Sequence, residues 1–100
     1  MIVGIMNVLN EAELLNHFFE HNLKLVDKLI IAEGGVRGHP FTTNEGHSID
    51  DTLKILGHWK RKYNDKIEII TQNEKWYSKQ DQQNATLDYL EDNDWCWGSN

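Results

Sequence analysis

The sequence is poor in cysteine, with one, Cys96, in 100 residues. A single cysteine excludes an intramolecular disulfide and a metal site built from several cysteines. Cys96 stands among apolar residues, which favours a buried and unreactive thiol. At this length the chain is expected to form one domain over residues 1–100, with only a modest core.

Long apolar runs and a basic amino-terminal segment are also absent. No stretch approaches the roughly 20 apolar residues of a membrane-spanning helix. The segment Met1 to Leu9 lacks the basic start and the length of a signal peptide. We therefore expect no membrane segment and a cytoplasmic location.

Basic residues are in the minority. Ten lysines and arginines face 16 acidic residues, giving a net charge of -6, and the basic residues are scattered apart from Lys60-Arg61-Lys62. Nucleic-acid binding uses clustered lysines and arginines that face phosphates. The charge therefore argues against a nucleic-acid partner.

Apolar runs alternate with helical patterns along the chain. The expected strands are Ile2 to Leu9, Leu29 to Ala32, Ile67 to Ile70 and a strand that begins at Trp95 to Trp97. The runs are continuous rather than alternating, which is typical of parallel strands buried on both faces. The order βαβαβαβ predicts an α/β fold, a parallel sheet with right-handed crossovers and helices on both faces.

Three polar segments are expected to begin the helices. Asn10 with Glu13, and Ser48 with Asp51, have the spacing of capping boxes, and Ser78 begins the third helix. Trp59 lies at helical spacing in the second helix and is expected in the core. Residues 34–47 show no period, and a loop of this length is expected to be functional or mobile.

Ligands of open parallel sheets bind outside the carboxyl ends of the strands. Glu33 directly follows the second apolar run, where a carboxylate can accept hydrogen bonds from a ribose or base. An equally weighted alternative is a turn residue that accepts from the amides of Gly34 and Gly35. The first strand-to-helix turn has no Gly-x-Gly-x-x-Gly, and no phosphate-binding Gly-x-x-x-x-Gly-Lys occurs, so a nucleotide must be held otherwise.

Several other side chains leave two interpretations open. Loop residues His39 and His47 either contact a phosphate or sugar or are solvated, and Trp76 and Tyr77 either stack on a ligand or cover the third helix. The pair His17 and His21 has the spacing of two zinc ligands on one helical face, but surface packing is the favoured interpretation.

Three short motifs occur in order: Asn10-Glu11-Ala12, Gln82-Gln83-Asn84 with Leu87, and Asp94-Trp95. With these motifs the chain resembles the amino-terminal, nucleotide-sugar-binding half of a family 2-like glycosyltransferase of the A-type fold. The resemblance covers nearly the whole chain. It implies a Rossmann-like, nucleotide-diphospho-sugar transferase fold that is incomplete here, and binding of a nucleoside diphosphate sugar for glycosyl transfer.

The resemblance also implies a donor site and a metal. The donor-binding residues are expected to be Asn7, Asn10, Glu11, Glu33, Arg37, Lys79, Gln83 and Asn84. Such transferases hold a divalent cation, Mn²⁺ or Mg²⁺, with an Asp-x-Asp motif, and Asn100 stands about where its first Asp is expected. An amide is a poorer ligand than a carboxylate for a hard cation, which makes metal binding doubtful. The catalytic residues are unknown, and the isolated chain is expected to be inactive.

A different class of function also fits the sequence. The acidic composition, the missing Asp-x-Asp motif and the aromatic pair Trp76-Tyr77 suit a non-catalytic α/β module that binds a protein partner. If the sheet continues past Asn100, its last strand leaves an open edge, which predicts self-association.

Overall fold

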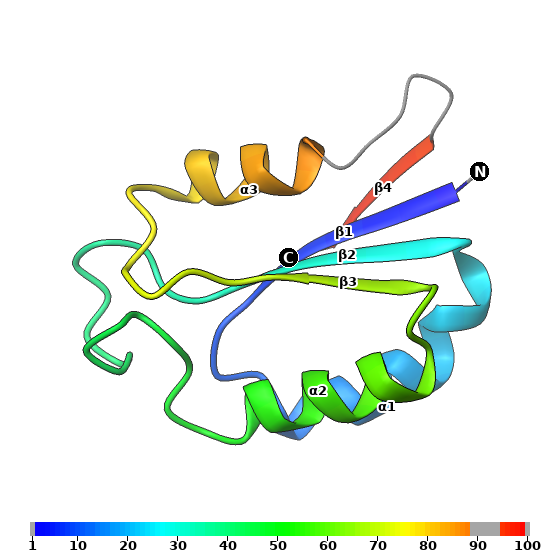
Figure 1. The fold of residues 1–100 in the computed structure, drawn as a ribbon, viewed down its shortest axis with the longest axis horizontal. Helices are drawn as coiled ribbons and strands as arrows, with labels where there is room; N and C mark the ends of the chain where they lie inside the picture. Colours follow the sequence, from blue (N-terminus) through cyan, green and yellow to red (C-terminus); the bar gives the residue numbers. More distant parts are fainter. Residues whose placement is uncertain (1, 89–94, 100) are drawn as a thin grey trace.

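The computed structural model describes residues 2–88 and the backbone of residues 95–99 (Figure 1). The elements, in chain order, are β1 (Ile2–Val8), α1 (Ala12–Asn22), the short 3₁₀ helix η1 (Leu23–Leu25), β2 (Lys28–Glu33), α2 (Thr52–Lys62), β3 (Ile67–Ile70), α3 (Lys79–Leu87) and β4 (Trp95–Ser99). The predicted βαβαβαβ order is confirmed. Asn100 and the Asp94 of the third motif lie outside the described residues.

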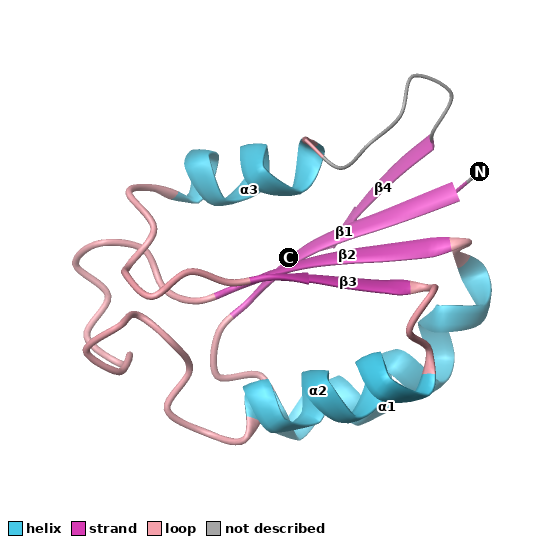
Figure 2. Ribbon diagram, viewed as in Figure 1, coloured by secondary structure: helices cyan, strands magenta, loops and turns pink. Residues whose placement is uncertain are grey.

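All neighbouring strands pair in parallel, in the order β3-β2-β1-β4. Helices α1 and α2 cover one face of the sheet and α3 lies over the other (Figure 2). The predicted α/β fold, with a parallel sheet and helices on both faces, is therefore confirmed. This strand order is the one found in the first four strands of doubly wound nucleotide-binding sheets. Strands β3 and β4 form the two edges of the sheet.

The larger part of the core lies between the sheet and α1 and α2. Phe19 of α1 and Trp59 of α2 stack there with ring centroids 5.1 Å apart. The indole nitrogen of Trp59 donates to the side-chain oxygen of Asn16, 2.8 Å away, so its polar atom is satisfied. The prediction that Trp59 belongs to the core is confirmed, because only 8% of its surface is exposed.

A smaller apolar cluster lies on the other face of the sheet. It consists of Val3, Ile5 and Ile30, with Ile70 packed against it. Strands β1 and β2 therefore bury side chains on both faces, which explains why their sequences are continuous apolar runs. Among residues 2–88 and 95–99, we find no helix with the length and apolar character needed to cross a membrane.

The helix starts differ from two of the three predictions. Helix α1 follows Glu11 and α2 follows Asp51, and neither residue caps its helix with a side-chain hydrogen bond. The capping boxes predicted at Asn10 and Ser48 are therefore wrong. The hydroxyl of Ser48 instead accepts from the backbone nitrogen of Asn10, 3.0 Å away. The carboxylate of Asp50 instead accepts from the first backbone nitrogens of both helices, from Thr52 of α2 nearby and from Ala12 of α1 far along the chain.

The third predicted start is confirmed. Ser78 is extended and precedes α3, and its hydroxyl accepts a hydrogen bond from the backbone nitrogen of Asp81 at 3.2 Å. Both partners of this cap lie within one helical turn, which is why a short-range pattern was sufficient to predict where the helix begins.

Candidate functional site

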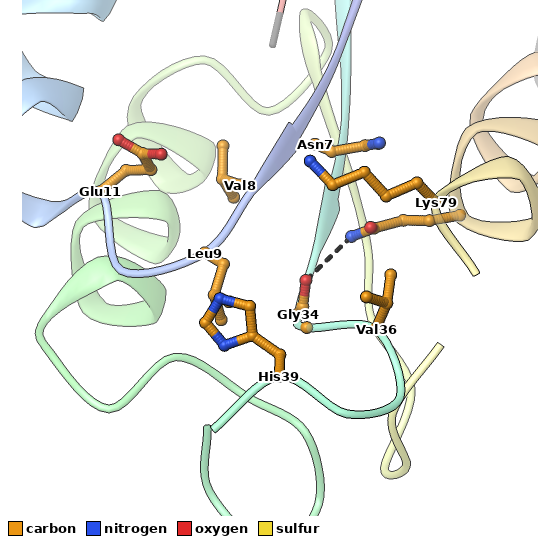
Figure 3. Close-up of a pocket in the computed structure, with 10 residues that line it drawn as sticks. Asn7, Val8, Leu9, Glu11, Gly34, Val36, His39 and Lys79 are labelled. Carbon is orange, nitrogen blue, oxygen red and sulfur yellow. Dashed lines mark hydrogen bonds between the residues drawn. The ribbon is translucent and has the colours of Figure 1, made fainter. Parts of the chain in front are cut away.

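A pocket of about 220 Å³ opens at the carboxyl ends of β1 and β2 (Figure 3). Its walls come from the end of β1, the turn into α1, the loop after β2 and the start of α3. The polar side chains that line it are Asn7, Glu11, His39, Lys79 and Gln82. This is the position at which open parallel sheets bind ligands.

Three of the eight predicted donor-site residues line this pocket: Asn7, Glu11 and Lys79. Asn7 is half-buried near the end of β1, Glu11 precedes α1, and Lys79 is exposed at the first position of α3. In Figure 3 the ammonium group of Lys79 points toward Asn7, across the opening from Glu11. The pocket thus has one cationic side and one anionic side.

His39 also lines the pocket, and its ring lies beside Leu9 in Figure 3. The ring nitrogen Nδ1 accepts a hydrogen bond from the backbone nitrogen of Phe41 at 3.2 Å. The backbone oxygen of His39 lies 3.3 Å from the ammonium group of Lys75. The loop histidine is therefore held at the wall of the pocket by contacts on both sides.

The motif on α3 reaches the pocket through a different glutamine than predicted. Gln83 and Asn84 are exposed, whereas Gln82 is 2% exposed and lines the pocket. The side-chain nitrogen of Gln82 donates to the backbone oxygens of Ala32 and Gly34, at 3.2 and 3.1 Å. Gln82 therefore fixes the end of β2, while Gln83 and Asn84 lie outside the pocket.

The helical spacing of Gln82 is the sequence feature that distinguishes it from Gln83. Residues four apart share one face of a helix, and Gln82 lies four residues before the equally buried Thr86. The weak apolar pattern of α3 conceals this face, because both of its buried side chains are polar.

Arg37 lies outside the pocket. Its guanidinium group lies 4.7 Å from the centre of the Tyr77 ring, and both side chains are exposed. The neighbouring Trp76 is only 7% exposed, and its indole nitrogen donates to the backbone oxygen of Glu33 at 3.0 Å. Trp76 is thus a packing residue, while Tyr77 is free to meet solvent with 68% of its surface.

The carboxylate of Glu33 is enclosed by its own chain and does not line the pocket. Its side chain is 0% exposed. One oxygen accepts from the backbone nitrogen of Ser48 at 2.7 Å, and the other lies 2.8 Å from Nδ1 of His47. The expected bonds from the amides of Gly34 and Gly35 are absent, because those groups donate to the backbone oxygens of Val8 and Gly46.

Asn10 has a similar role in the loop rather than in the pocket. Its side-chain nitrogen donates to the backbone oxygen of Phe41, and its oxygen accepts from the backbone nitrogen of Ile49, both at 2.8 Å. Asn10 adopts a left-handed backbone conformation with a φ of 54°. Asparagine tolerates this region better than most residues. Glu33 and Asn10 therefore position residues 34–51, and the pocket is shaped by them indirectly.

Close backbone packing holds the same loop to the connection between β3 and α3. The backbone nitrogen of Gly35 donates to the oxygen of Gly46, and that of Trp76 donates to the oxygen of Gly35. Gly46 has a φ of +83°, and a Cβ atom there would lie 2.8 Å from the backbone of Lys75. Only glycine fits this approach without displacement of the backbone.

Two titratable groups in and next to the loop after β2 have shifted pKa values. The hydrogen bond to Glu33 raises the pKa of His47, and burial opposes that rise without cancelling it. For Asp50, burial acts to raise the pKa, but hydrogen bonds from Thr52 and Ala12 outweigh it and leave the pKa below its ordinary value.

The described residues offer no cation site. Among residues 2–88 we find no group of three or more histidine, cysteine or acidic side chains that could hold a metal ion. Asn100, the expected metal ligand, lies outside the described part of the chain. The Mn²⁺ or Mg²⁺ of the resembled family therefore remains a prediction.

Comparison with known proteins does not identify a family for this chain. No family model matches it, and no curated protein or solved structure shows significant similarity.

Proposed function

We propose that the pocket binds a nucleoside diphosphate sugar donor, as in the donor-binding half of a glycosyltransferase-like domain with a Rossmann-like arrangement. The observation that carries the proposal is the position of Lys79. It places a cation in a pocket at the carboxyl ends of β1 and β2. In sheets of this strand order, that edge is where nucleotides bind.

The start of α3 adds partial positive charge to the Lys79 side of the pocket. Glu11 and Lys79 both line the pocket and lie at the starts of α1 and α3. The first backbone N–H groups of a helix have no partner within the helix and carry partial positive charge. At α1 the backbone nitrogens of Glu11 and Ala12 already donate to the side chains of Thr52 and Asp50. Lys79 and the start of α3 therefore provide the positive charge that offsets, at this edge, the repulsion of an acidic chain for phosphates.

The remaining polar side chains suit the rest of a nucleotide. The amide of Asn7 both donates and accepts hydrogen bonds, and the carboxylate of Glu11 accepts them from hydroxyl groups such as those of ribose. Because a pocket of about 220 Å³ is smaller than the roughly 300–1,000 Å³ of ordinary ligand sites, it encloses only part of the donor. We assign the diphosphate to the side of Lys79 and the ribose to the side of Glu11.

The cation of the resembled family has no role in this proposal. Among residues 2–88 we find no group of three or more histidine, cysteine or acidic side chains that could hold it, and the proposal assigns neutralisation of the diphosphate to Lys79 and the start of α3. We therefore expect weak binding, with a Kd in the millimolar range, about -4 kcal/mol. Added Mn²⁺ is expected to change this Kd little.

Titration of the protein with UDP, GDP and CDP, followed by ligand-observed NMR and by backbone amide shifts, tests the proposal. The expected result is saturable binding that shifts the amides of residues 7–11, 34–36 and 79–82. Uridine and inorganic pyrophosphate, titrated separately, show which half of the nucleotide provides the affinity. Absence of a saturable signal with all three nucleotides, or shifts confined to other residues, would refute the proposal.

A second candidate is a non-catalytic protein-interaction module. Phe41 and Ile49 are 62% and 60% exposed, and the backbones of both are hydrogen-bonded to the side chain of Asn10, so the two residues are held near one point of the chain. Exposed apolar side chains that gather on one surface are typical of interaction sites. A second copy of the chain is the partner to test first. Sedimentation equilibrium should then show an oligomer that the double substitution of Phe41→Ser and Ile49→Ser dissociates.

A further inference from the structure

We propose that residues 34–51, the loop that follows the carboxyl end of β2, form a pH-sensitive strap. The strap is closed when His47 is protonated and loosened when His47 is neutral. We name the group formed by Glu33, His47 and Asn73 the His47 latch. The latch joins the end of β2, the strap and the connection between β3 and α3. The strap carries Gly34, Gly35, Val36 and His39 of the pocket wall, so its closure determines the shape of the pocket.

The geometry of the latch fits a charged imidazole. Nδ1 of His47 lies 2.8 Å from a carboxylate oxygen of Glu33, and Nε2 lies 3.1 Å from the side-chain oxygen of Asn73. An acceptor therefore faces each ring nitrogen, and only the protonated ring donates from both. The Glu33 side chain is 0% exposed, whereas that of His47 is 18% exposed, so the ring can exchange its proton with solvent.

The charges around His47 favour the protonated ring. The hydrogen bond that His47 donates to Glu33 raises its pKa most, burial opposes it, and the bond to Asn73 raises it further. Electrostatic attraction to Glu33 on β2 and to Glu45 on the strap itself acts in the same direction as the hydrogen bonds. The connection opposite contributes Glu74 and Lys75 next to Asn73 in sequence. The ammonium group of Lys75 lies 3.3 Å from the backbone oxygen of His39.

Loss of the proton from His47 removes the countercharge of a buried carboxylate. A neutral ring donates from one nitrogen only, so it can keep the bond to Glu33 only if Nε2 gives up its proton and the Asn73 amide turns its nitrogen toward it. In every such arrangement the positive charge beside Glu33 is gone. If the carboxylate stays buried, it is then paired only with neutral donors such as the Ser48 amide, and a buried charge without a charged partner is costly. Opening of the strap relieves this cost by admitting water to Glu33.

The direction of the pH effect follows from linkage. The pKa of His47 is raised above its ordinary value of 6.5. The free energy by which protonated His47 stabilises the closed strap is therefore fully present below pH 6.5. The contribution is lost as the pH rises through the raised pKa. The strap is therefore expected to be closed in mildly acidic solution and to open more often in mildly alkaline solution.

NMR on the free protein tests the latch without any ligand. The imidazole shifts of His47 give its pKa, and amide hydrogen-exchange protection factors at Gly35 and Ser48 give the opening equilibrium of the strap at each pH. We expect the pKa of His47 to lie above 6.5. Between mildly acidic and mildly alkaline solution, the opening constant of the strap should then rise in total by about tenfold for each unit by which this pKa exceeds 6.5. A pKa of 6.5 or lower, or an opening constant that does not change with pH, would overturn the proposal.

Two matched substitutions strengthen the test. His47→Gln keeps a hydrogen-bonding side chain that cannot be charged. The opening constant of the strap in this variant should not change with pH. His58→Gln replaces an exposed histidine on α2 and should leave the pH dependence of the strap as in the unsubstituted protein. If His47→Gln retains that dependence, another group is responsible and the proposal is wrong. Since no nucleotide is present, the result does not depend on the proposed function.

Discussion

The side-chain oxygen of Asn10 accepts a hydrogen bond from the backbone nitrogen of Ile49, 39 residues later in the chain and 2.8 Å away. The amide nitrogen of the same side chain donates to Phe41. The single residue Asn10, in the turn after β1, thus fixes two points of the loop that follows β2. The loop that borders the pocket is therefore held by a side chain that does not itself line the pocket.

Replacement of Asn10 should loosen this loop and destabilise the protein. Asn10→Gly keeps the left-handed backbone accessible and removes only the two side-chain hydrogen bonds, so we expect a loss of about 1–3 kcal/mol. Asn10→Ala should cost about 1–2 kcal/mol more, because alanine is strained in the left-handed region. Urea denaturation of the two variants measures both losses. Equal losses would show that the φ of Asn10 carries no strain.

Substitution of two glycines by alanine should have opposite effects on stability. A Cβ atom at Gly46 would meet the Lys75 backbone at 2.8 Å, and the φ there is +83°, so Gly46→Ala should destabilise the protein by about 2 kcal/mol or more. A Cβ atom at Gly57, inside α2, meets nothing within 4 Å. Gly57→Ala should stabilise by up to about 1 kcal/mol through its helix propensity.

Thermal and urea unfolding of these two variants provides the measurement. The same chemical change is made in both, so the difference reports the environment of each glycine. A Gly46→Ala protein as stable as the unsubstituted one would contradict the close approach of the loop to the connection before α3.

Removal of the Lys79 charge should weaken nucleotide binding. We expect Lys79→Ala to raise the Kd for UDP roughly fivefold, about 1 kcal/mol, because an exposed cation contributes modestly to a phosphate contact. Lys24→Ala removes an equally exposed charge from η1, away from the pocket, and should leave the Kd unchanged. Equal Kd values for the two variants in NMR titrations would show that Lys79 does not contact the ligand.

Asp50 should make stability depend on pH at the acidic end. Its carboxylate accepts from Thr52 and Ala12, joining the starts of α2 and α1, and its pKa is lowered from 3.8 despite the opposing effect of burial. A lowered pKa means that the stabilisation is present above pH 3.8 and is lost as the pH falls through the lowered value. Asp50→Asn should therefore destabilise the protein at pH 7, by up to about 1 kcal/mol.

The neighbouring residue provides the control for this substitution. Asp51 is also exposed but makes no side-chain cap bond to α2, so Asp51→Asn should have little effect. The free energy of unfolding in urea, measured at pH 7 and again at the lowest pH at which the protein stays folded, gives the comparison. An Asp50→Asn effect that stays constant with pH would contradict the assigned hydrogen bonds.

The sequence was sufficient for the features that depend on near neighbours along the chain. The continuous apolar runs predicted four parallel strands, and the alternation of strands and helices predicted the α/β order. Helix α3 begins after Ser78 as expected, and the hydroxyl that caps it accepts from Asp81, only three residues away. The pocket lies at the edge that the same pattern indicates, since the carboxyl ends of parallel strands meet there.

Tertiary structure decided which polar side chains reach the pocket. Glu33 lies at the predicted edge, but both oxygens of its carboxylate are hydrogen-bonded to residues 47 and 48. These two residues reach Glu33 only because the long loop folds back over it. Asn10 is likewise committed to the loop, and the phase of α3 turns Gln82 inward while Gln83 faces solvent. A polar side chain hydrogen-bonds to whichever partner folding brings near, and for these residues that partner lies far along the chain, where short-range patterns carry no information.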